Sequence, residues 1–353
     1  MAPAYSYKVK GTEETGSTSA EAEHIYSKFV QQNPYQLRNS GFAVWNDAVN
    51  EPAPGWNSFP SATGSYSNMS SSSPSPKRVQ GVSGYAVELT SISVMGIANA
   101  NGNLTTGRVN MGDMNAKSAA NHNFTDVENK DYYMIIKGQP DGVEFYSKFT
   151  ASSSNQAKAG NAKFIIHDKC TDNYKDPEVD SLLEHRIGLC NVSISPSTEW
   201  TKQTGTFAYD WNATDAAATD KYILVDFTTN ITPGESAGDV LTIDEVTLVY
   251  NSELSAATYD GKAVTLADGE ATVDAAYDES KLVLESNGRG ATIEKSYDAN
   301  TYKLTIVVKG NDFSENAANK HEYAIQFAKA EPATVTELSS PITISINGQT
   351  SAP

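Results

Sequence analysis

The sequence predicts an all-β protein: a jelly-roll β-sandwich followed by a small immunoglobulin-like sandwich, with a short N-terminal helix. Two observations support this fold class. Many short segments alternate apolar and polar residues and are separated by turns rich in Gly, Pro, Asn and Asp, as strands with one buried face do. No helical pattern lies between these segments, as a βαβ fold would require. At 353 residues, the chain is long enough for two or three domains.

Residues 1–35 differ from the rest of the chain. The run Thr18–Glu21 fits a capping box, in which the first side chain and the Glu three residues later satisfy free backbone amides. Apolar residues follow at helical spacing: Ala22, Ile25, Tyr26, Phe29 and Val30. One amphipathic helix ending before Pro34 is predicted, either packed on the sandwich or left from an upstream module.

Residues 36–250 are expected to form one jelly-roll domain that handles carbohydrate. Asn39–Trp56 and Val240–Tyr250 are predicted to be its first and last strands, lying side by side. In the second segment apolar residues alternate, and Asp244 interrupts the buried stretch. A carboxylate there must be hydrogen-bonded or hold a cation, because burying it unpaired is costly.

Other strands of this domain are predicted from alternation between turns such as Ala100–Asn103 and Gln139–Gly142. The expected strands are Ala86–Ser93, Tyr132–Lys137, Val143–Ala151, Ala162–Asp168, Gly188–Ile194, Thr206–Tyr209, Tyr222–Thr228 and Val240–Tyr250. The segment Asn68–Pro76 is Ser-rich and too polar for a core, so a mobile surface loop is expected there.

Residues 251–330 are expected to form the immunoglobulin-like domain. The sequence TYDGKAV has Asp260-Gly261 as a hairpin turn signal. Four alternating segments follow at suitable spacing: Lys281–Glu285, Ala291–Lys295, Lys303–Lys309 and Glu322–Phe327. Residues 331–353 are interpreted as a linker with one strand, Pro341–Asn347, without a partner of its own, at the start of a further β-module.

Charge excludes some classes of partner. The chain carries 43 acidic and 26 basic residues, a net charge of −17, and this field repels nucleic acid and anionic membrane surfaces. No apolar run approaches the roughly 20 residues of a membrane-spanning helix. The low charged fraction and the 18 Tyr are typical of secreted or cell-surface bacterial β-proteins. No signal peptide precedes the fold, so the start at Met1 is expected to follow removal of an export signal.

Two cysteines, Cys170 and Cys190, lie in apolar, strand-like contexts. A disulfide between neighbouring strands would suit an oxidising compartment, and two buried free thiols are the alternative. Both remain open, because the sequence does not supply the geometry.

Four motifs in order resemble one family. They are Trp45 with Pro54–Phe59, Gly102–Arg108, Gly138–Gly142 with Phe145–Phe149, and Leu241–Tyr250. Together they resemble the "putative carbohydrate metabolism domain" family of surface lipoproteins in glycan-foraging gut bacteria, over Leu37–Tyr250. The following module resembles the immunoglobulin-like domain frequent in such lipoproteins, and the final residues are similar to the opening strand of a calycin-like barrel.

This resemblance implies a jelly roll exported to the outer-membrane surface and held there by a lipid anchor. It implies a role in polysaccharide utilisation, with a glycan as ligand and other outer-membrane glycan-uptake proteins as partners. The family supplies no catalytic residues to carry over.

The ends of the domain also resemble calcium-containing carbohydrate-binding jelly rolls. In those modules an Asn-x-x-Phe-Glu segment and an Ile-Asp-Asp-Val strand hold a structural cation, and here Asn39, Phe42 and Asp244 match. Asn39 and Asp244 are therefore the candidate calcium ligands. Ala43 stands where the Glu would be, which removes one oxygen from a cation that takes six to eight. No other cofactor is expected.

Sugar recognition needs flat apolar rings and polar side chains. Trp45 and Trp200 are interpreted as structural, while Trp56 after a Pro-Gly turn is either rim or core. The candidate carbohydrate-binding residues are Trp56, Tyr66, Tyr146, Trp211 and Asp141, with Trp211 on a polar loop as the best flat ring. For Asp141, between Pro140 and Gly142, capping a turn is the favoured role.

Catalysis is not favoured. A glycoside hydrolase needs two facing carboxyls, and neither Asp141 with Glu144 nor Asp244 with Glu245 points to one face of a strand. His167, Asp168 and His185 do not make a recognisable zinc motif. The prediction is non-catalytic glycan binding. A glycoside hydrolase or lyase with carboxylates from separate strands is the alternative, and a structural or adhesion spacer is the second alternative.

Overall fold

The computed structural model describes residues 33–52, 54–170, 172–210, 221–331, 344–346 and 349–351. The chain divides into two compact units. The first comprises Met1–Asn251, Gly288–Ala291 and Gly310–Asn319, and the second comprises Ser252–Asn287, Thr292–Lys309 and Lys320–Pro353. The predicted N-terminal helix lies outside the described residues. Within the described ranges, no helix has the length and apolar character needed to cross a membrane.

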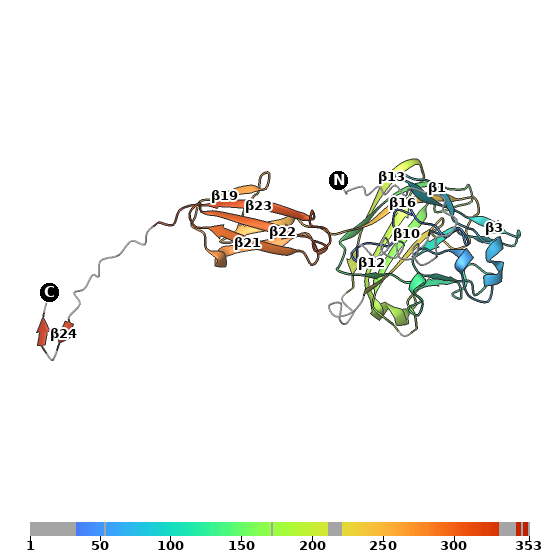
Figure 1. The fold of residues 1–353 in the computed structure, drawn as a ribbon, viewed down its shortest axis with the longest axis horizontal. Helices are drawn as coiled ribbons and strands as arrows, with labels where there is room; N and C mark the ends of the chain where they lie inside the picture. The colour runs from blue at the N-terminus through green and yellow to red at the C-terminus, as the bar shows by residue number, and fades with distance from the viewer. Residues whose placement is uncertain are drawn as a thin grey trace, which may run out of the picture. The chain divides into compact units, whose positions relative to one another are not determined.

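Two antiparallel sheets build the first unit (Figure 1). The five-stranded sheet has the order β1 (Lys77–Gln80), β2 (Tyr85–Thr90), β16 (Val240–Val249), β9 (Gly142–Thr150) and β13 (Ser197–Thr206). The six-stranded sheet has the path β14 (Ala208–Tyr209), β12 (Arg186–Ile194), β10 (Gly160–His167), β15 (Lys221–Thr228) and β5 (Asn103–Thr105), and β8 (Ile135–Ile136) pairs with β15.

The two sheets share one hydrophobic core, which confirms the predicted all-β sandwich. Phe145 of β9 meets Phe227 of β15 edge-on with ring centroids 5.3 Å apart, and Phe164 of β10 lies 5.7 Å from Phe227. All three rings are buried, and edge-to-face geometry is favourable for aromatic pairs. Residues of β2, β9 and β16 thus face residues of β10, β12 and β15.

The two ends of this unit lie side by side, as predicted, but the first is not a strand. The Val246 amide donates to the Ser40 carbonyl at 3.0 Å. Asn39, Phe42 and Asn50 have positive φ, a conformation that interrupts extended backbone. The described residues of Asn39–Trp56 therefore form an irregular segment in which only an isolated bridge pairs Asn46 with Glu51.

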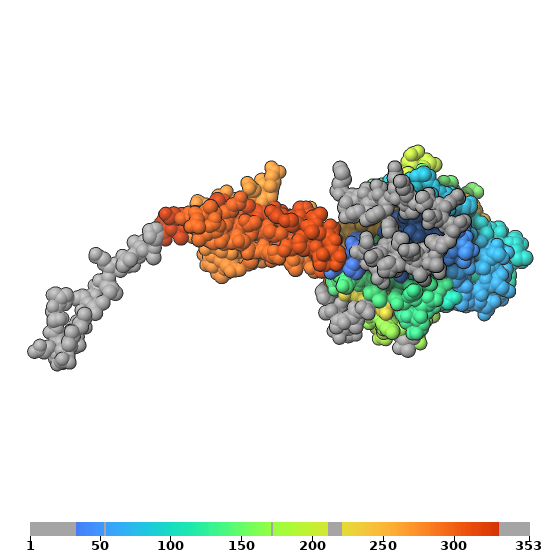
Figure 2. Space-filling model, in the orientation of Figure 1, coloured from blue at the N-terminus to red at the C-terminus, as the bar shows by residue number. Residues whose placement is uncertain are grey.

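Smaller elements cover the outer face of the six-stranded sheet. A hairpin pairs β3 (Ile92–Val94) with β4 (Ala98–Ala100), and a three-stranded sheet joins β11 (Lys175–Asp176), β7 (His122–Phe124) and β6 (Arg108–Asn110). The 3-10 helices of this unit are η1 (Phe59–Ser61), η2 (Ser67–Ser72), η3 (Lys130–Tyr132) and η4 (Asp180–His185). The elements η1, η2 and β3 lie at one end of the unit, where the surface is blue and cyan (Figure 2).

The main difference from the sequence prediction is that several observed strands were not predicted. The strand β13 was not expected, because its Ser-, Thr- and charge-rich sequence lacks an apolar face and its residues are half-buried or exposed. The segment predicted as a loop at Asn68–Pro76 contributes most of η2.

The second unit is a small sandwich. A sheet of β18 (Lys262–Ala263), β17 (Leu254–Tyr259) and β20 (Leu282–Ser286) faces a sheet of β19 (Glu270–Val273), β23 (Lys320–Phe327), β22 (Lys303–Lys309) and β21 (Thr292–Asp298). The short helix η5 (Glu279–Lys281) precedes β20. Tyr259 meets Phe327 across the two sheets at 5.0 Å. Near the C-terminus, β24 (Ile344–Ile346) pairs with β25 (Gln349–Ser351), so the strand expected to be alone has a partner.

Both cysteines are buried free thiols. Cys190 belongs to the core between the two sheets. Cys170 belongs to a separate cluster with Ile165, Tyr174 and Leu224, on the outer side of the six-stranded sheet. The sheet therefore separates the two thiols, and the free-thiol alternative is the one that the structure contains.

Candidate functional site

A cavity of about 460 Å³ lies on the outer face of the six-stranded sheet. Strand alternation places its floor. In β15, Val225 and Phe227 point into the core, so Asp226 and Thr228 lie on the opposite face, and both line the cavity. Lys163 of β10 reaches the same floor by the same alternation.

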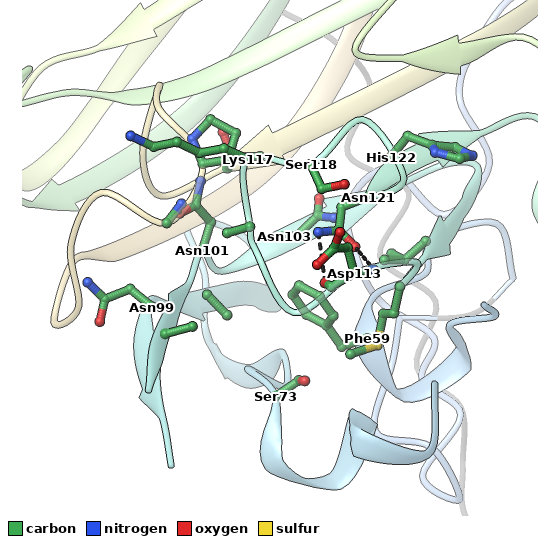
Figure 3. A pocket seen from close by; sticks show the side chains of 18 of the residues that line it. Phe59, Ser73, Asn99, Asn101, Asn103, Asp113, Lys117, Ser118, Asn121 and His122 are labelled. Carbon is green, nitrogen blue, oxygen red and sulfur yellow. Dashed lines mark hydrogen bonds between the residues drawn. The ribbon is translucent and has the colours of Figure 1, made fainter. Parts of the chain in front are cut away.

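The walls of the cavity come from short helices and from the β3–β4 hairpin, which lie outside the two sheets of the sandwich. Phe59 of η1, Met69 of η2 and Tyr66, which directly precedes η2, line the cavity, and the β3–β4 hairpin contributes Asn99. Figure 3 shows Phe59 beside the cavity, Asn99 and Asn101 on one side, and Asn121 and His122 on the other. A rigid sheet thus supplies the floor, and loops and short helices supply the walls.

The floor is a polar network of side chains from three strands. Asn103 of β5 and Asn123 of β7 exchange amide hydrogen bonds of 2.9 and 3.2 Å. The Asn123 amide also donates to Oδ1 of Asp226 at 2.8 Å. Asn103, Asn123 and Asp226 are each at least nine-tenths buried. The network therefore fixes the orientation of one oxygen of the Asp226 carboxyl.

The other oxygen of Asp226 has no such partner. Four buried side-chain polar atoms in the described part of the chain make no hydrogen bond, and Oδ2 of Asp226 is the one among them whose residue lines the cavity. Burial and the Asp176 carboxylate raise the pKa of Asp226 to about 8, against the opposing effects of the Thr105 hydroxyl, the Lys163 ammonium and the Asn123 amide. Near neutral pH this group is mostly a neutral acid.

Lys163 and Asp176 form an ion pair beside Asp226. The Lys163 ammonium lies 2.6 Å from Oδ1 of Asp176, and both side chains are largely buried. Burial lowers the pKa of Lys163, but the Asp176 carboxylate outweighs it and the net shift is upward. Lys163 thus stays charged, and its charge is matched by Asp176 rather than by Asp226.

Asparagine is the most frequent polar residue of the lining. Eight line the cavity: Asn99, Asn101, Asn103, Asn110, Asn121, Asn123, Asn161 and Asn230. Several are committed to the protein, such as Asn121, which caps Gly112 and Asp113. The side-chain amides of Asn99 and Asn161 make no hydrogen bond to the residues that the structure describes. They can donate and accept at once, as hydroxyl recognition requires.

The rim of the cavity is apolar and exposed. Met95, Ile97, Met114 and Ile231 line it and are 71%, 68%, 43% and 49% exposed. Contiguous exposed apolar surface on a soluble domain marks ligand or partner contact. The cavity thus combines apolar walls with a few polar groups at its floor, the composition usual for small-ligand sites.

Of the predicted sugar-binding residues, Tyr66 lines this cavity. Trp56 does not: it is fully buried, packs edge-on against Phe42 at 5.3 Å, and donates its indole N–H to the Arg38 carbonyl. Its ring is part of the core because the Pro-Gly turn directs it inward. Trp211 lies outside the described residues.

Tyr146 is separated from the cavity by the whole sandwich. It belongs to β9 in the five-stranded sheet, where Phe145 points into the core. Alternation puts Tyr146 on the outer face of that sheet, half-buried near Lys202, its cross-strand partner. The structure therefore does not bring Tyr66 and Tyr146 into one site.

Asp141 has a structural role. Its Oδ2 accepts a hydrogen bond of 2.7 Å from the Asn251 amide, and its own amide donates to the Val249 carbonyl. Burial raises the pKa of this carboxyl. Its Oδ1 accepts from the Arg289 amide at 2.7 Å, so both oxygens bind distant backbone amides rather than the turn of Pro140 and Gly142. Asp141 does not line the cavity.

The proposed calcium ligands are committed elsewhere. Oδ2 of Asp244 accepts from the amides of Val82 and Ser83 at 2.8 and 3.3 Å, and Oδ1 accepts from Glu245 at 2.8 Å. The side chain of Asn39 closes a loop onto both backbone groups of Val44. Across the described ranges, no group of three or more His, Cys, Asp or Glu is arranged to hold a metal ion. These residues do not fit a calcium site.

His167, Asp168 and His185 do converge, as a hydrogen-bonded cluster. Nδ1 of His185 lies 2.7 Å from Oδ1 of Asp168, and His167 stacks on Tyr174 at 4.3 Å. Burial lowers the pKa of His167 to about 3, so it stays neutral. The cluster supports packing on the outer face of the sheet.

Sequence reasoning missed the cavity floor and most of its walls. Asp226 and Lys163 lie within apolar strands and carry no motif. The asparagines did leave a signal, because residues 98–103 (ANANGN) and 115–123 (NAKSAANHN) are unusually rich in Asn. Ala100–Asn103 is predicted from the sequence to be a turn, and residues 115–123 carry no sequence-based prediction.

Comparisons with known proteins find only solved structures of low similarity to this chain. No protein-family model and no curated protein matches the chain. Among solved structures, one described as a "putative glycoside hydrolase" from Bacteroides thetaiotaomicron aligns at TM-score 0.40 and 18% identity, covering 50% of this chain and 57% of that one. The chain thus matches little more than half of that structure's length.

Two further structures are carbohydrate-binding modules by their descriptions. The family 11 module of the cellulase Lic26A-Cel5E of Clostridium thermocellum aligns at TM-score 0.24 and 13% identity, covering 50% of this chain and 81% of that one. A structure described as "CBM4 structure and function" aligns at 0.20 and 12%, covering 46% and 91%. Since all three scores lie below 0.5, the fold assignment rests on the sheet pairing described above.

Proposed function

We propose that the first unit binds a glycan in the cavity on the outer face of its six-stranded sheet, without cleaving it. The observation that supports this is the composition of that cavity, in which amide side chains lie between apolar walls. Asn99 and Asn161 have free amides for sugar hydroxyls, and Phe59 and Tyr66 offer rings for the C–H faces of a pyranose.

The physical basis is a match between two kinds of surface. A sugar ring presents hydroxyls at its edge and apolar C–H groups on its faces, so a site must offer both. Aromatic rings supply apolar area at low entropic cost. A volume of about 460 Å³ falls within the range of small-ligand sites and suits one or two sugar units.

The test is glycan-array screening followed by calorimetry on a matched pair of variants. Tyr66→Ala removes a ring from the cavity, and Tyr146→Ala removes the same side chain from the opposite sheet. We expect Tyr66→Ala to weaken binding about tenfold, equivalent to about 1.4 kcal/mol, and Tyr146→Ala to leave it unchanged. Loss with Tyr146→Ala alone would move the site to the other face, and equal losses would contradict a site confined to the cavity.

Glycoside hydrolysis is the second candidate, favoured by two carboxyls in the same cavity. Asp176 and Asp226 come from separate elements, and one has its pKa raised to about 8 while the other is ion-paired with Lys163. Divergent environments are how glycosidases separate acid from base. Release of reducing ends from a polysaccharide panel, abolished by both Asp226→Asn and Asp176→Asn, would establish this candidate instead.

We further infer the cellular setting from composition and from the resemblance of the sequence motifs. The net charge of −17 and the two all-β units in series suit a surface protein of a glycan-using bacterium. A lipid anchor, a cell-surface location and membership of the "putative carbohydrate metabolism domain" family belong to this proposal, as does the immunoglobulin-like nature of the second unit. Globomycin-sensitive processing of the precursor would test the anchor.

A further inference from the structure

We propose that Asp226 recognises a carbonyl oxygen of the bound glycan, and that the acetamido group of an N-acetylated amino sugar is the ligand group that the cavity floor accepts. This rests on the proposed function and adds the class of sugar to it. Oδ2 of Asp226 is nine-tenths buried or more, lacks a partner, and belongs to the cavity floor.

The hydrogen-bonding pattern around Asp226 fixes which oxygen carries the proton. Oδ1 already accepts from the Asn123 amide at 2.8 Å, and that acceptor role leaves the proton to Oδ2 when the group is neutral. Two side-chain hydrogen bonds with Asn103 hold Asn123 in place. Oδ2 is then a donor without an acceptor, and a buried unpaired donor costs about 1–3 kcal/mol. A ligand oxygen that only accepts would satisfy it.

Burial and the Asp176 carboxylate of β11 raise the pKa of Asp226 and keep it neutral. Lys163 of β10, the Thr105 hydroxyl of β5 and the Asn123 amide of β7 favour the charged form but are outweighed. Lys163 is bound to Asp176 at 2.6 Å, so an ionised Asp226 would leave this cluster with one uncompensated negative charge. The pKa of about 8 is consistent with this balance.

Apolar surface for the acetamido methyl lies one cross-strand pair away. Val109 of β6 is the direct partner of Asn123 and therefore lies on the same face. Val109 is 4% exposed and lines the cavity. A carbonyl oxygen at Asp226 and a methyl group at Val109 together match an acetamido group, whereas a hydroxyl would leave the apolar surface uncovered.

A uronic acid fits this floor less well, although its carboxylate also accepts. The net charge of −17 repels anionic sugars, and Lys163, the cation beside Asp226, is already paired with Asp176. The acetamido group is neutral, so the net charge does not repel it and it needs no cation to bind.

The experiment is calorimetry with sugar pairs that differ only in this group. Oligomers of N-acetylglucosamine and glucose, and of N-acetylgalactosamine and galactose, are titrated into the full chain. At about pH 6 we expect at least one acetamido sugar to bind tenfold or more tightly than its hydroxyl partner. Binding of hydroxyl sugars with equal or higher affinity would overturn the proposal and leave the glycan-binding function standing, while absence of all binding would overturn both.

Two variants and a pH series identify Asp226 as the residue responsible. Asp226→Asn keeps a donor at the position of Oδ2, so we expect it to hold affinity within about threefold and to bind independently of pH. Asp226→Leu removes the donor, so we expect the affinity for the acetamido sugar to fall at least tenfold. Asp47→Asn, an exposed change outside the cavity, is the control.

In the wild-type chain, affinity should fall by up to about thirtyfold between about pH 6 and pH 9.5, the ratio of protonated fractions for a pKa of about 8. Affinity that rises with pH would show that the carboxylate is the binding form and would contradict the proposal. A pH dependence that persists in Asp226→Asn would assign it to another group and would also contradict it. Circular dichroism of each variant shows that the fold is retained.

Discussion

The side chain of Gln36 pairs with both backbone groups of Leu248, although the two residues are 212 positions apart. Nε2 donates to the Leu248 carbonyl at 2.7 Å, and Oε1 accepts from the Leu248 amide at 2.8 Å. The side chain replaces a neighbouring strand at this point of β16. The N-terminal segment is thereby fastened to the last strand of the sandwich.

Gln36→Leu should lower the free energy of unfolding by about 2 kcal/mol. The change leaves two partly buried backbone groups of Leu248 without partners, each worth about 1 kcal/mol. Urea denaturation of the full chain measures this, with Gln80→Leu as the control because that side chain is exposed. Equal stability of the two variants would show that the pairing contributes nothing.

Glu51 should make the protein less stable as pH rises from about 4.5 to 7. Burial raises the pKa of this carboxyl from 4.5 to about 7, against hydrogen bonds from Ser58 and Ser61. The native state therefore holds a proton that the unfolded state has released, and stability falls with increasing pH across this window. The loss is about 3 kcal/mol.

Glu51→Gln should flatten this part of the stability profile, because the amide does not titrate. The comparison is made by urea denaturation from about pH 4 to pH 8. Glu88→Gln, which alters a surface ion pair with Lys77, should keep the wild-type slope. An unchanged slope in Glu51→Gln would assign the pH dependence to another group.

Asp239→Asn should destabilise the first unit by about 3 kcal/mol at neutral pH. The buried carboxylate accepts only, and its two oxygens receive hydrogen bonds from Ser91, Ser152, Asn155, Asn230 and Ser236. An amide in its place would turn one acceptor into a donor that faces donors. The measurement is thermal and urea unfolding, and a variant as stable as the wild type would contradict it.

The same carboxylate should contribute to acid unfolding. Burial alone would raise its pKa, but the hydrogen bonds outweigh it and lower the pKa from 3.8 to about 2. The stabilisation is complete above about pH 4 and is lost as pH falls toward 2, by about 2 kcal/mol. Asp239→Asn should lack this loss in an acid titration monitored by circular dichroism.

Cys170 and Cys190 should remain thiols in the folded protein even under oxidising conditions. They lie in clusters on opposite faces of one sheet, and burial raises both thiol pKa values to about 11. Alkylation after unfolding without reductant should label two cysteines, and native protein should react slowly with a thiol reagent. A mass two units lower, with no labelling, would demonstrate a disulfide.

Sequence alone identified the strands whose apolar residues alternate. The interval Lys303–Lys309 was predicted with the bounds of β22, and Val240–Tyr250 nearly matched β16. The edge strand β13 escaped because its exposed faces carry no apolar residues. The segment Asn39–Trp56 was misassigned because its apolar residues fill the core from an irregular backbone with positive φ at Asn39 and Phe42.

The site was less predictable than the fold. Trp56 was proposed for sugar stacking, yet a large ring beside a turn can equally fill the core, and here it does. Asp226 and Lys163 are cross-strand partners, and Asp176 of β11 approaches Lys163 from a separate sheet, so their proximity has no local signature in sequence. Tyr66, a candidate from the sequence, lines the cavity, and its role in sugar binding stays a prediction.

The location of the ligand is the central claim, and side-chain amide resonances test it most directly. In spectra of isotope-labelled protein at saturating glycan, we expect the largest shifts at the free amides of Asn99 and Asn161, followed by Asn103 and Asn123. Resonances near Tyr146 and Trp200, on the outer face of the other sheet, should stay in place. Shifts confined to that face, with the cavity amides unmoved, would contradict the account.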